Sequence, residues 1–198
     1  MSLRVLGIDP GLTRCGVGIV DVEASRSAVL VHVSVIRTPT DMPLERRLLA
    51  IGEGIAALLD EFQPAAVALE RVFAQNNVRT VMGTAQASGV AMHAAAARGL
   101  SVGLHTPSEV KAAVTGYGSA DKKQIATMVQ RILRLDAPPT PADASDALAL
   151  ALCHAWRSNG TMRAVDSSAP APSMSGLTPA QEAWRKAEKS VVARRLGQ

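Results

Sequence analysis

Four acidic residues in three separate parts of the sequence are the candidates for chemistry. Asp9 follows a short apolar run, Glu70 ends another, and Asp143 and Asp146 stand three positions apart in a third apolar stretch. A carboxylate in such surroundings is costly unless a cation or hydrogen-bond donors neutralise it. Mg²⁺ prefers oxygen ligands, and two such ions can stabilise the attacking and leaving oxygens of a phosphodiester. The pattern therefore predicts metal-assisted phosphoryl transfer.

Each acid also has a simpler interpretation when it is considered alone. Asp9 begins Asp-Pro-Gly, which is common turn chemistry in which the aspartate bonds only the backbone of the turn. Glu70 could be a surface charge just past a strand, and Asp143 resembles the acidic member of a helix capping box. Asp146 has no such alternative, because it shares a helical face with Leu150 and would lie against the core. The conjunction of all four is what favours a metal site.

The apolar periodicity of the chain predicts the elements that would position these acids. Strands are expected at residues 3–8, 16–20, 29–36, 65–70 and 102–105, and helices at 44–62, 80–98, from 107, 121–134 and 140–157. The first three strands would form an antiparallel meander, and the later order implies an α/β fold, a mixed five-stranded sheet flanked by helices on both faces. Asp9 would lie at the first turn, and Glu70 at the carboxyl end of a central parallel strand.

The helix expected at 80–98 is dense in glycine, alanine and serine. Small side chains allow another backbone to approach closely, so this helix would pack either on its own sheet or on a second subunit. The sequence leaves both arrangements open.

Length and composition predict one main domain with a tail. The chain has 198 residues, of which 47% are hydrophobic and 3% aromatic, and this suffices for a sizeable core. We expect the folded domain at 1–158, a linker rich in serine, proline and alanine at 159–178, and a basic, helix-compatible tail at 179–198. Because no apolar segment has membrane length and no secretion signal is present, the expected location is the cytoplasm, away from membranes.

Charge and cysteine content narrow the class of partner only slightly. The net charge of +4 and the pI of about 9.5 favour an anionic partner without naming it. Cys15 and Cys153 lack metal-binding spacing, so both are expected to be reduced, packed thiols.

Five ordered blocks of sequence resemble the RuvC Holliday junction resolvases of bacteria, which are nucleases of the ribonuclease H-like superfamily. The blocks are LGIDPG at 6–11, ALERVF at 68–73, GTAQASGV at 83–90, GYGSADK at 116–122 and ADASDALA at 142–149. The resemblance implies a ribonuclease H-like fold and a homodimer that makes paired symmetric nicks in strands of like polarity at four-way DNA junctions. It also implies 5′-phosphate and 3′-hydroxyl ends, a role in recombination and repair, and partnership with the branch-migration proteins RuvA and RuvB.

The resemblance further implies roles for individual residues. The proposed ligands of two Mg²⁺ ions, with Mn²⁺ as a substitute, are Asp9, Glu70, Asp143 and Asp146. The proposed DNA-contacting residues are Phe73, Asn76, Asn77, Arg79, Lys111 and Lys122. Phe73 would stack on an opened base. Lys122 stands at a helix start, where a cation opposes the helix dipole unless an anion binds there. In isolation, these residues would more commonly be core, turn or solvated surface residues.

Three other functions fit parts of the sequence. A nuclease of the same superfamily acting on structured RNA shares the carboxylates, and Phe73 with the two lysines favours DNA. The run at 7–11 also resembles a phosphate loop of the actin and sugar-kinase superfamily, but the chain is too short for two lobes and a second such loop. A catalytically silent junction-binding module is disfavoured by the full set of acids.

Overall fold

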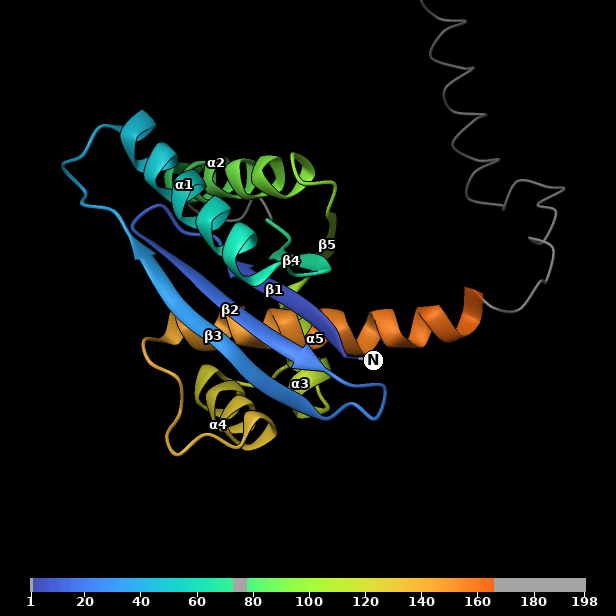
Figure 1. The fold of residues 1–198 in the computed structure, drawn as a ribbon. Helices are drawn as coiled ribbons and strands as arrows, with labels where there is room; N and C mark the ends of the chain where they lie inside the picture. The colour runs from blue at the N-terminus through green and yellow to red at the C-terminus, as the bar shows by residue number, and fades with distance from the viewer. Residues whose placement is uncertain (1, 73–77, 166–198) are drawn as a thin grey trace, which may run out of the picture. The chain divides into compact units, whose positions relative to one another are not determined.

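A five-stranded mixed sheet forms the centre of the structure, a computed structural model that describes residues 2–72 and 78–165 (Figure 1). The strands are β1 (Leu3–Asp9), β2 (Arg14–Val22), β3 (Ala28–Arg37), β4 (Ala66–Glu70) and β5 (Ser101–His105). Their order is β3-β2-β1-β4-β5, with β1, β2 and β3 antiparallel and β1, β4 and β5 parallel. The predicted meander and mixed sheet are therefore confirmed.

In the part of the chain that the structure describes, five helices cover the two faces of this sheet (Figure 1). They are α1 (Leu44–Phe62), α2 (Val78–Ala96), α3 (Pro107–Thr115), α4 (Lys122–Leu133) and α5 (Ala142–Val165). One core contains strand residues such as Leu6 and Ile8 packed against α1 and α2. The other contains Val5 and Ala68 packed against α3, α4 and α5. The side chains of neighbouring strand residues thus point into opposite cores, as the alternation of side chains along a strand requires.

The small-residue helix α2 packs on its own domain along one face. Ala87, Ala91 and Ala95 are fully buried in the core that α1 also joins. Met82 and Met92 on α2 are exposed. Packing of the small residues within the subunit is therefore observed, and a second subunit on the exposed face remains a prediction.

Helix α5 lies in direct backbone contact with the sheet because glycines face it. A Cβ atom added to Gly7 of β1 would lie 2.1 Å from the carbonyl oxygen of Ala147, and one added to Gly16 of β2 would lie 2.1 Å from that of Asp143. Real Cβ atoms do not approach other atoms so closely, so only glycine permits this arrangement. The contact sets the first turns of α5 beside the end of β1.

The observed end of α5 differs from the expected one. The helix continues to Val165, whereas the apolar pattern ends near residue 157. Because helical hydrogen bonds form within the backbone itself, the helix can continue past the end of the apolar pattern. The compact unit that contains the sheet spans Met1–Ala164. The linker and tail expected farther along fall largely at 166–198, outside the described residues, so the domain division stays a prediction.

Two expectations from composition bear on the described residues. Cys15 and Cys153 are both buried and unpaired, as expected. Within the described ranges, none of the helices combines the length and the apolar character needed to cross a membrane.

Candidate active site

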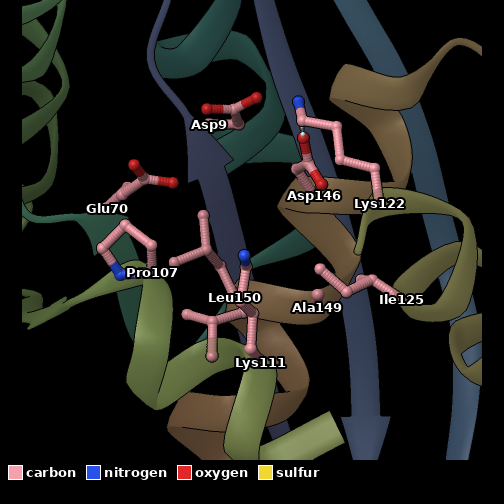
Figure 2. A pocket seen from close by; sticks show the side chains of 10 residues that line it. Asp9, Glu70, Pro107, Lys111, Lys122, Ile125, Asp146, Ala149 and Leu150 are labelled. Carbon is pink, nitrogen blue, oxygen red and sulfur yellow. Dashed lines mark hydrogen bonds and ion pairs between the residues drawn. The ribbon is translucent and has the colours of Figure 1, made fainter. Parts of the chain in front are cut away.

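Three of the four predicted acids line one pocket at the edge of the sheet. Figure 2 shows Asp9, Glu70 and Asp146 around this pocket, which has a volume of about 300 Å³ and is called the acidic pocket below. Its other lining residues are Pro107, Val110, Lys111, Lys122, Ile125, Ala149 and Leu150. Acids that are far apart in the sequence are therefore brought together by the fold.

The sheet topology explains why these acids meet. Strands β1 and β4 are parallel neighbours, with Ile8 paired to Leu69, so Asp9 and Glu70 emerge at the same edge. The close contact of α5 with Gly7 then places Asp146 beside them. One mixed sheet and one helix thus supply three carboxylates to the acidic pocket.

Asp143 faces a different side of the same region and is held by a cation. Its Oδ2 lies 2.9 Å from Nε of Arg14, the first residue of β2. Asp146 is also engaged, because its Oδ2 lies 3.0 Å from Nζ of Lys122. Among the described residues, no three histidine, cysteine, aspartate or glutamate side chains form a group that could hold one metal ion as they stand. The four acids are neighbours but do not form a closed ligand set, and their role as ligands stays a prediction.

The electrostatics of the acidic pocket favour an added cation. The pKa of Asp9 is raised from its ordinary value to about 7, first by burial and then by the negative charges of Asp146, Glu70 and Asp143, with Lys122 opposing. The pKa of Glu70 is also raised, by burial and by Asp146. Carboxylate oxygens with excess negative charge are what a hard divalent cation such as Mg²⁺ prefers. The donor set therefore fits a metal of this kind.

The raised pKa of Asp9 predicts that Asp9→Asn stabilises the protein in a pH-dependent way. Because the pKa in the folded state is above that in the unfolded chain, the contribution of Asp9 to stability falls as pH rises from about 4 to about 7. Asparagine does not ionise, so the variant avoids this loss of stability. In urea unfolding with chelator present, we expect the variant to gain about 2–4 kcal/mol at pH 8 and little at pH 4. An equal gain at both pH values would contradict this account.

Two lysines border the acidic pocket from different helices. Lys111 belongs to α3 and Lys122 is the first residue of α4. At the start of α4, where the sequence predicts an anion beside Lys122, Asp121 caps the helix and accepts a bond from the N–H of Gln124 at 2.8 Å. The Asp121 carboxylate therefore already takes an N–H group that an added anion would otherwise bind. Lys122, with its side chain 76% exposed, remains available to an anion by exchanging its partner Asp146.

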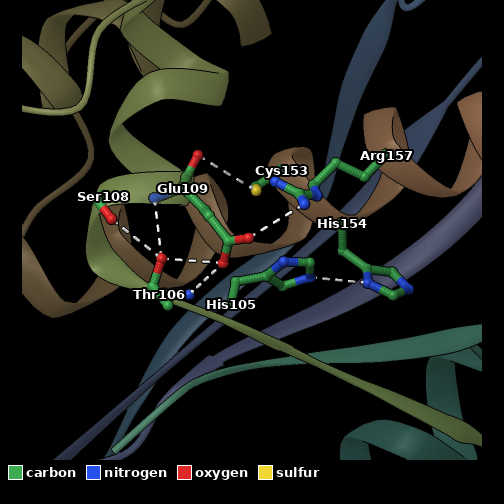
Figure 3. A network of polar contacts seen from close by, with 7 residues as sticks. All are labelled: His105, Thr106, Ser108, Glu109, Cys153, His154 and Arg157. Carbon is green, nitrogen blue, oxygen red and sulfur yellow. Dashed lines mark hydrogen bonds and ion pairs between the residues drawn. The ribbon is translucent and has the colours of Figure 1, made fainter. Parts of the chain in front are cut away.

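A polar network holds α3 to α5 (Figure 3). Thr106 caps α3 in a reciprocal capping box with Glu109, and Glu109 pairs with Arg157 of α5 at 3.1 Å. Beside them, Nε2 of His105 lies 2.9 Å from Nδ1 of His154. The network fixes the helix that carries Lys111.

The pair formed by His105 and His154 is a feature that the sequence does not predict. Burial, followed by the neighbouring His154, lowers the pKa of His105 to about 4. Burial likewise lowers the pKa of His154. The two rings can therefore share one hydrogen bond as neutral groups near pH 7. The two residues lie on different elements and have no recognisable spacing, so the sequence carried no signal for the pair.

Several predicted DNA-contacting residues lie where the structure gives no description. Phe73, Asn76 and Asn77 are outside the described residues. Arg79 belongs to the first turn of α2, but its side chain is likewise outside the described part. Their roles stay predictions.

The fold and the position of the acids together define a class of protein. The sheet is mixed and contains an antiparallel meander, and the acids lie at the ends of the first and fourth strands and on the last helix. This is the ribonuclease H-like arrangement that the sequence predicted. A family model described as "Crossover junction endodeoxyribonuclease RuvC" matches residues 5–154.

Curated relatives and solved structures agree with this match. The crossover junction endodeoxyribonuclease RuvC of Leifsonia xyli is 67% identical over 97% of this chain and 95% of that protein. The corresponding protein of Clavibacter michiganensis is 60% identical over 98% of this chain and 100% of that protein. The structure of Thermus thermophilus RuvC in complex with Holliday junction substrate has a TM-score of 0.77 at 36% identity and covers 80% of this chain and 96% of that chain. A yeast mitochondrial Holliday junction resolvase, at 14% identity and a TM-score of 0.58 over 81% of this chain and 82% of that chain, shares the fold.

The chain belongs to the RuvC family of crossover junction endodeoxyribonucleases.

Proposed function

We propose that this protein is a Holliday junction resolvase, a metal-dependent endodeoxyribonuclease that cuts four-way DNA junctions during recombination and repair. The main support is the family match over residues 5–154 together with the acidic pocket built by β1, β4 and α5. The T. thermophilus relative was solved with a Holliday junction substrate, which supports the same substrate for this chain.

The four acids are the proposed metal ligands. Asp9, Glu70, Asp143 and Asp146 would hold two Mg²⁺ ions, with Mn²⁺ as a substitute. When bound, such ions activate water and stabilise the departing 3′ oxygen of the phosphodiester. To hold a metal ion, Asp143 and Asp146 would each have to exchange a protein cation, because Arg14 and Lys122 now contact one oxygen of each. The products would carry 5′-phosphate and 3′-hydroxyl ends.

The two lysines that line the acidic pocket have their own part in the proposed mechanism. Lys122 lies at the mouth of the acidic pocket with a largely exposed side chain, and Lys111 lines the same pocket. Both can contact phosphates near the cut and orient the strand over the acids. Phe73 is the proposed stacking residue, with Asn76, Asn77 and Arg79 as further DNA contacts.

A homodimer would give the reaction its symmetry. A four-way junction contains two strands of like polarity related by an approximate two-fold axis, and two subunits present two equivalent sites. The exposed face of α2 is the proposed interface. The branch-migration proteins RuvA and RuvB are proposed partners, and the cytoplasm is the proposed location.

One assay tests the proposed function. A synthetic four-way junction, labelled at both ends, is incubated with the full chain in Mg²⁺, Ca²⁺ or chelator, and the products are mapped at nucleotide resolution. We expect paired, symmetric nicks with Mg²⁺ alone. Competition between the junction and a structured RNA tests the closest alternative, a nuclease that acts on RNA. Preferential cleavage of the RNA would overturn the proposal. So would a lack of metal-dependent nicking of the junction.

Lys122→Ala is expected to slow junction cleavage about 10- to 100-fold at low salt, with a smaller deficit as salt rises. The reason is that a phosphate contact beside the acidic pocket is removed, so the variant depends less steeply on salt than the wild-type protein. Initial nicking rates are measured at several NaCl concentrations. Lys123→Ala is the matched control, since Lys123 is the next residue of α4 but does not line the pocket. Equal effects of the two substitutions would show that Lys122 acts only through general surface charge.

A further inference from the structure

A second depression lies beside Asp143, apart from the acidic pocket. It has a volume of about 650 Å³ and is called the basic groove below. Its lining residues are Gly11, Leu12, Thr13, Arg14, Arg47, Gly83, Thr84 and Asp143. Two arginines and one aspartate give this lining a net charge of +1. Asp143 borders the groove and, by the proposed function, also serves the metal site, so this residue links the groove to that site.

Arg47 is the first sign that the basic groove receives an anion. This half-buried residue of α1 donates from Nε to the hydroxyl of Thr38 at 2.9 Å and from Nη2 to the hydroxyl of Thr13 at 2.8 Å. No carboxylate of the described residues lies within 4.0 Å of it. Hydroxyl groups orient a guanidinium but do not neutralise it. A partly desolvated cation that is held in place without a counter-charge favours binding of an anion.

The turn that carries Asp9 into β2 is built into the same groove. Thr38 is almost fully buried, its hydroxyl bonds the carbonyl of Leu12, and its N–H donates to the carbonyl of Thr13 at 3.1 Å. On the opposite wall, α2 comes close, since a Cβ added to Gly83 would lie 3.6 Å from Cβ of Leu12. The walls of the groove are therefore fixed by buried bonds and by packing, which makes it a built feature of the fold.

Arg14 supplies the second cation. Its side chain is 55% exposed and pairs with Asp143 through Nε at 2.9 Å. A guanidinium has five N–H donors in a planar fork, so one bond to a carboxylate leaves donors for a phosphate. The hydroxyls of Thr13 and Thr84 add neutral donors to the same lining. This combination of two guanidinium groups and hydroxyls suits the phosphates of a nucleic-acid backbone.

We propose that the basic groove binds the phosphates that flank the cleaved one, with Arg47 and Arg14 as the contacting residues. A strand that passes over the acidic pocket must continue on both sides of the cut. Lys111 and Lys122 lie on the side of α3 and α4, whereas the basic groove lies beyond Asp143, between the first turn, α1 and α2. This inference rests on the proposed function and assigns the path of the same DNA strand.

The test is the salt dependence of junction binding in chelator, where no cleavage occurs. Fluorescent four-way junction is titrated with the full chain at about 50–200 mM NaCl. We expect Arg47→Met and Arg14→Gln each to weaken binding about tenfold near 100 mM NaCl. Each should also reduce the slope of log affinity against log salt by about 0.9 for every phosphate contact that the substitution removes. Arg47→Lys keeps the charge and should retain most of the slope.

Arg98→Gln is the matched control. Arg98 also pairs with a carboxylate, Asp60, at 2.6 Å, but it follows α2 near the start of β5, at the opposite edge of the sheet. Its removal should leave the slope unchanged. Melting temperatures of all variants report whether folding is affected.

Three outcomes would overturn the inference. If wild-type protein nicks junctions but Arg47→Met and Arg14→Gln keep the wild-type slope, the proposed function stands and the groove has no DNA role. If affinity falls with an unchanged slope and a lowered melting temperature, Arg47 only holds the turn through Thr13 and Thr38. If wild-type protein neither binds nor nicks junctions, the proposed function and this inference fail together.

Discussion

Asp146→Asn is expected to lower the rate of Mg²⁺-dependent junction nicking by about 1,000-fold or more, equivalent to about 4 kcal/mol of transition-state stabilisation. Asp146 lines the acidic pocket, and one of its oxygens already faces a cation, Lys122, at 3.0 Å. Asparagine keeps the shape of the side chain but has one neutral oxygen, so it is a poor ligand for a divalent ion. Single-turnover nicking of a labelled junction measures the effect.

Binding separates a catalytic role of Asp146 from a structural one. In chelator, we expect Asp146→Asn to bind the junction as tightly as wild-type protein or more tightly, because Lys122 loses its carboxylate partner and becomes free for phosphate. Ser145→Ala is the matched control on the same turn of α5. The Ser145 hydroxyl is buried and has no hydrogen-bond partner among the described residues, so its removal should leave both activities intact. Nicking by Asp146→Asn within tenfold of wild type would refute its role as a ligand.

Gly7→Ala is expected to destabilise the protein by about 3 kcal/mol or more and to abolish junction cleavage. The added Cβ would lie 2.1 Å from the carbonyl oxygen of Ala147 and 2.7 Å from the backbone nitrogen of Ala151. Backbone atoms of a packed helix cannot move aside as a flexible side chain can. Helix α5 must therefore shift away from β1, and Asp143 and Asp146 shift with it.

Urea unfolding of Gly7→Ala and of a matched glycine variant tests this explanation. Gly89 lies within α2, and a Cβ added there would meet nothing within 4 Å. Because alanine has the higher helix propensity, Gly89→Ala should stabilise the protein by up to about 1 kcal/mol. A destabilisation below about 1 kcal/mol for Gly7→Ala would show that α5 does not depend on this contact.

The spacing of apolar residues within single elements was sufficient to predict most of the helices and strands. The spacing of Leu44, Ile51, Ile55 and Phe62 predicts a helix that the structure has at Leu44–Phe62. The apolar run that ends on Glu70 predicts the central strand β4. Such signals lie within one element, since the period of the side chains follows directly from helix or strand geometry. The fold class and the four candidate acids therefore follow from the order and types of the residues.

The partners of the site residues could not be found in this way. Arg14 meets Asp143, and Lys122 meets Asp146, across long stretches of chain. The sequence drew attention to Lys122 but to neither Arg14 nor Arg47, because a single arginine at a strand start or on a helix face has no distinctive spacing. Only the order of the strands hints at Arg14. In an antiparallel pair, Arg14 at the start of β2 lies near Asp9 at the end of β1.

By itself, the sequence determined most of the secondary structure, the mixed sheet and which acids are candidates for the site, because each of these depends on residue type and on short-range periodicity. Only the tertiary structure decided that α5 lies against Gly7 and Gly16, that Asp143 and Asp146 are paired with protein cations, and that Arg47 faces a groove without a carboxylate partner among the described residues. These features arise from how finished elements pack on one another. The distances between side chains on different elements are set by that packing, and no spacing along the chain encodes them.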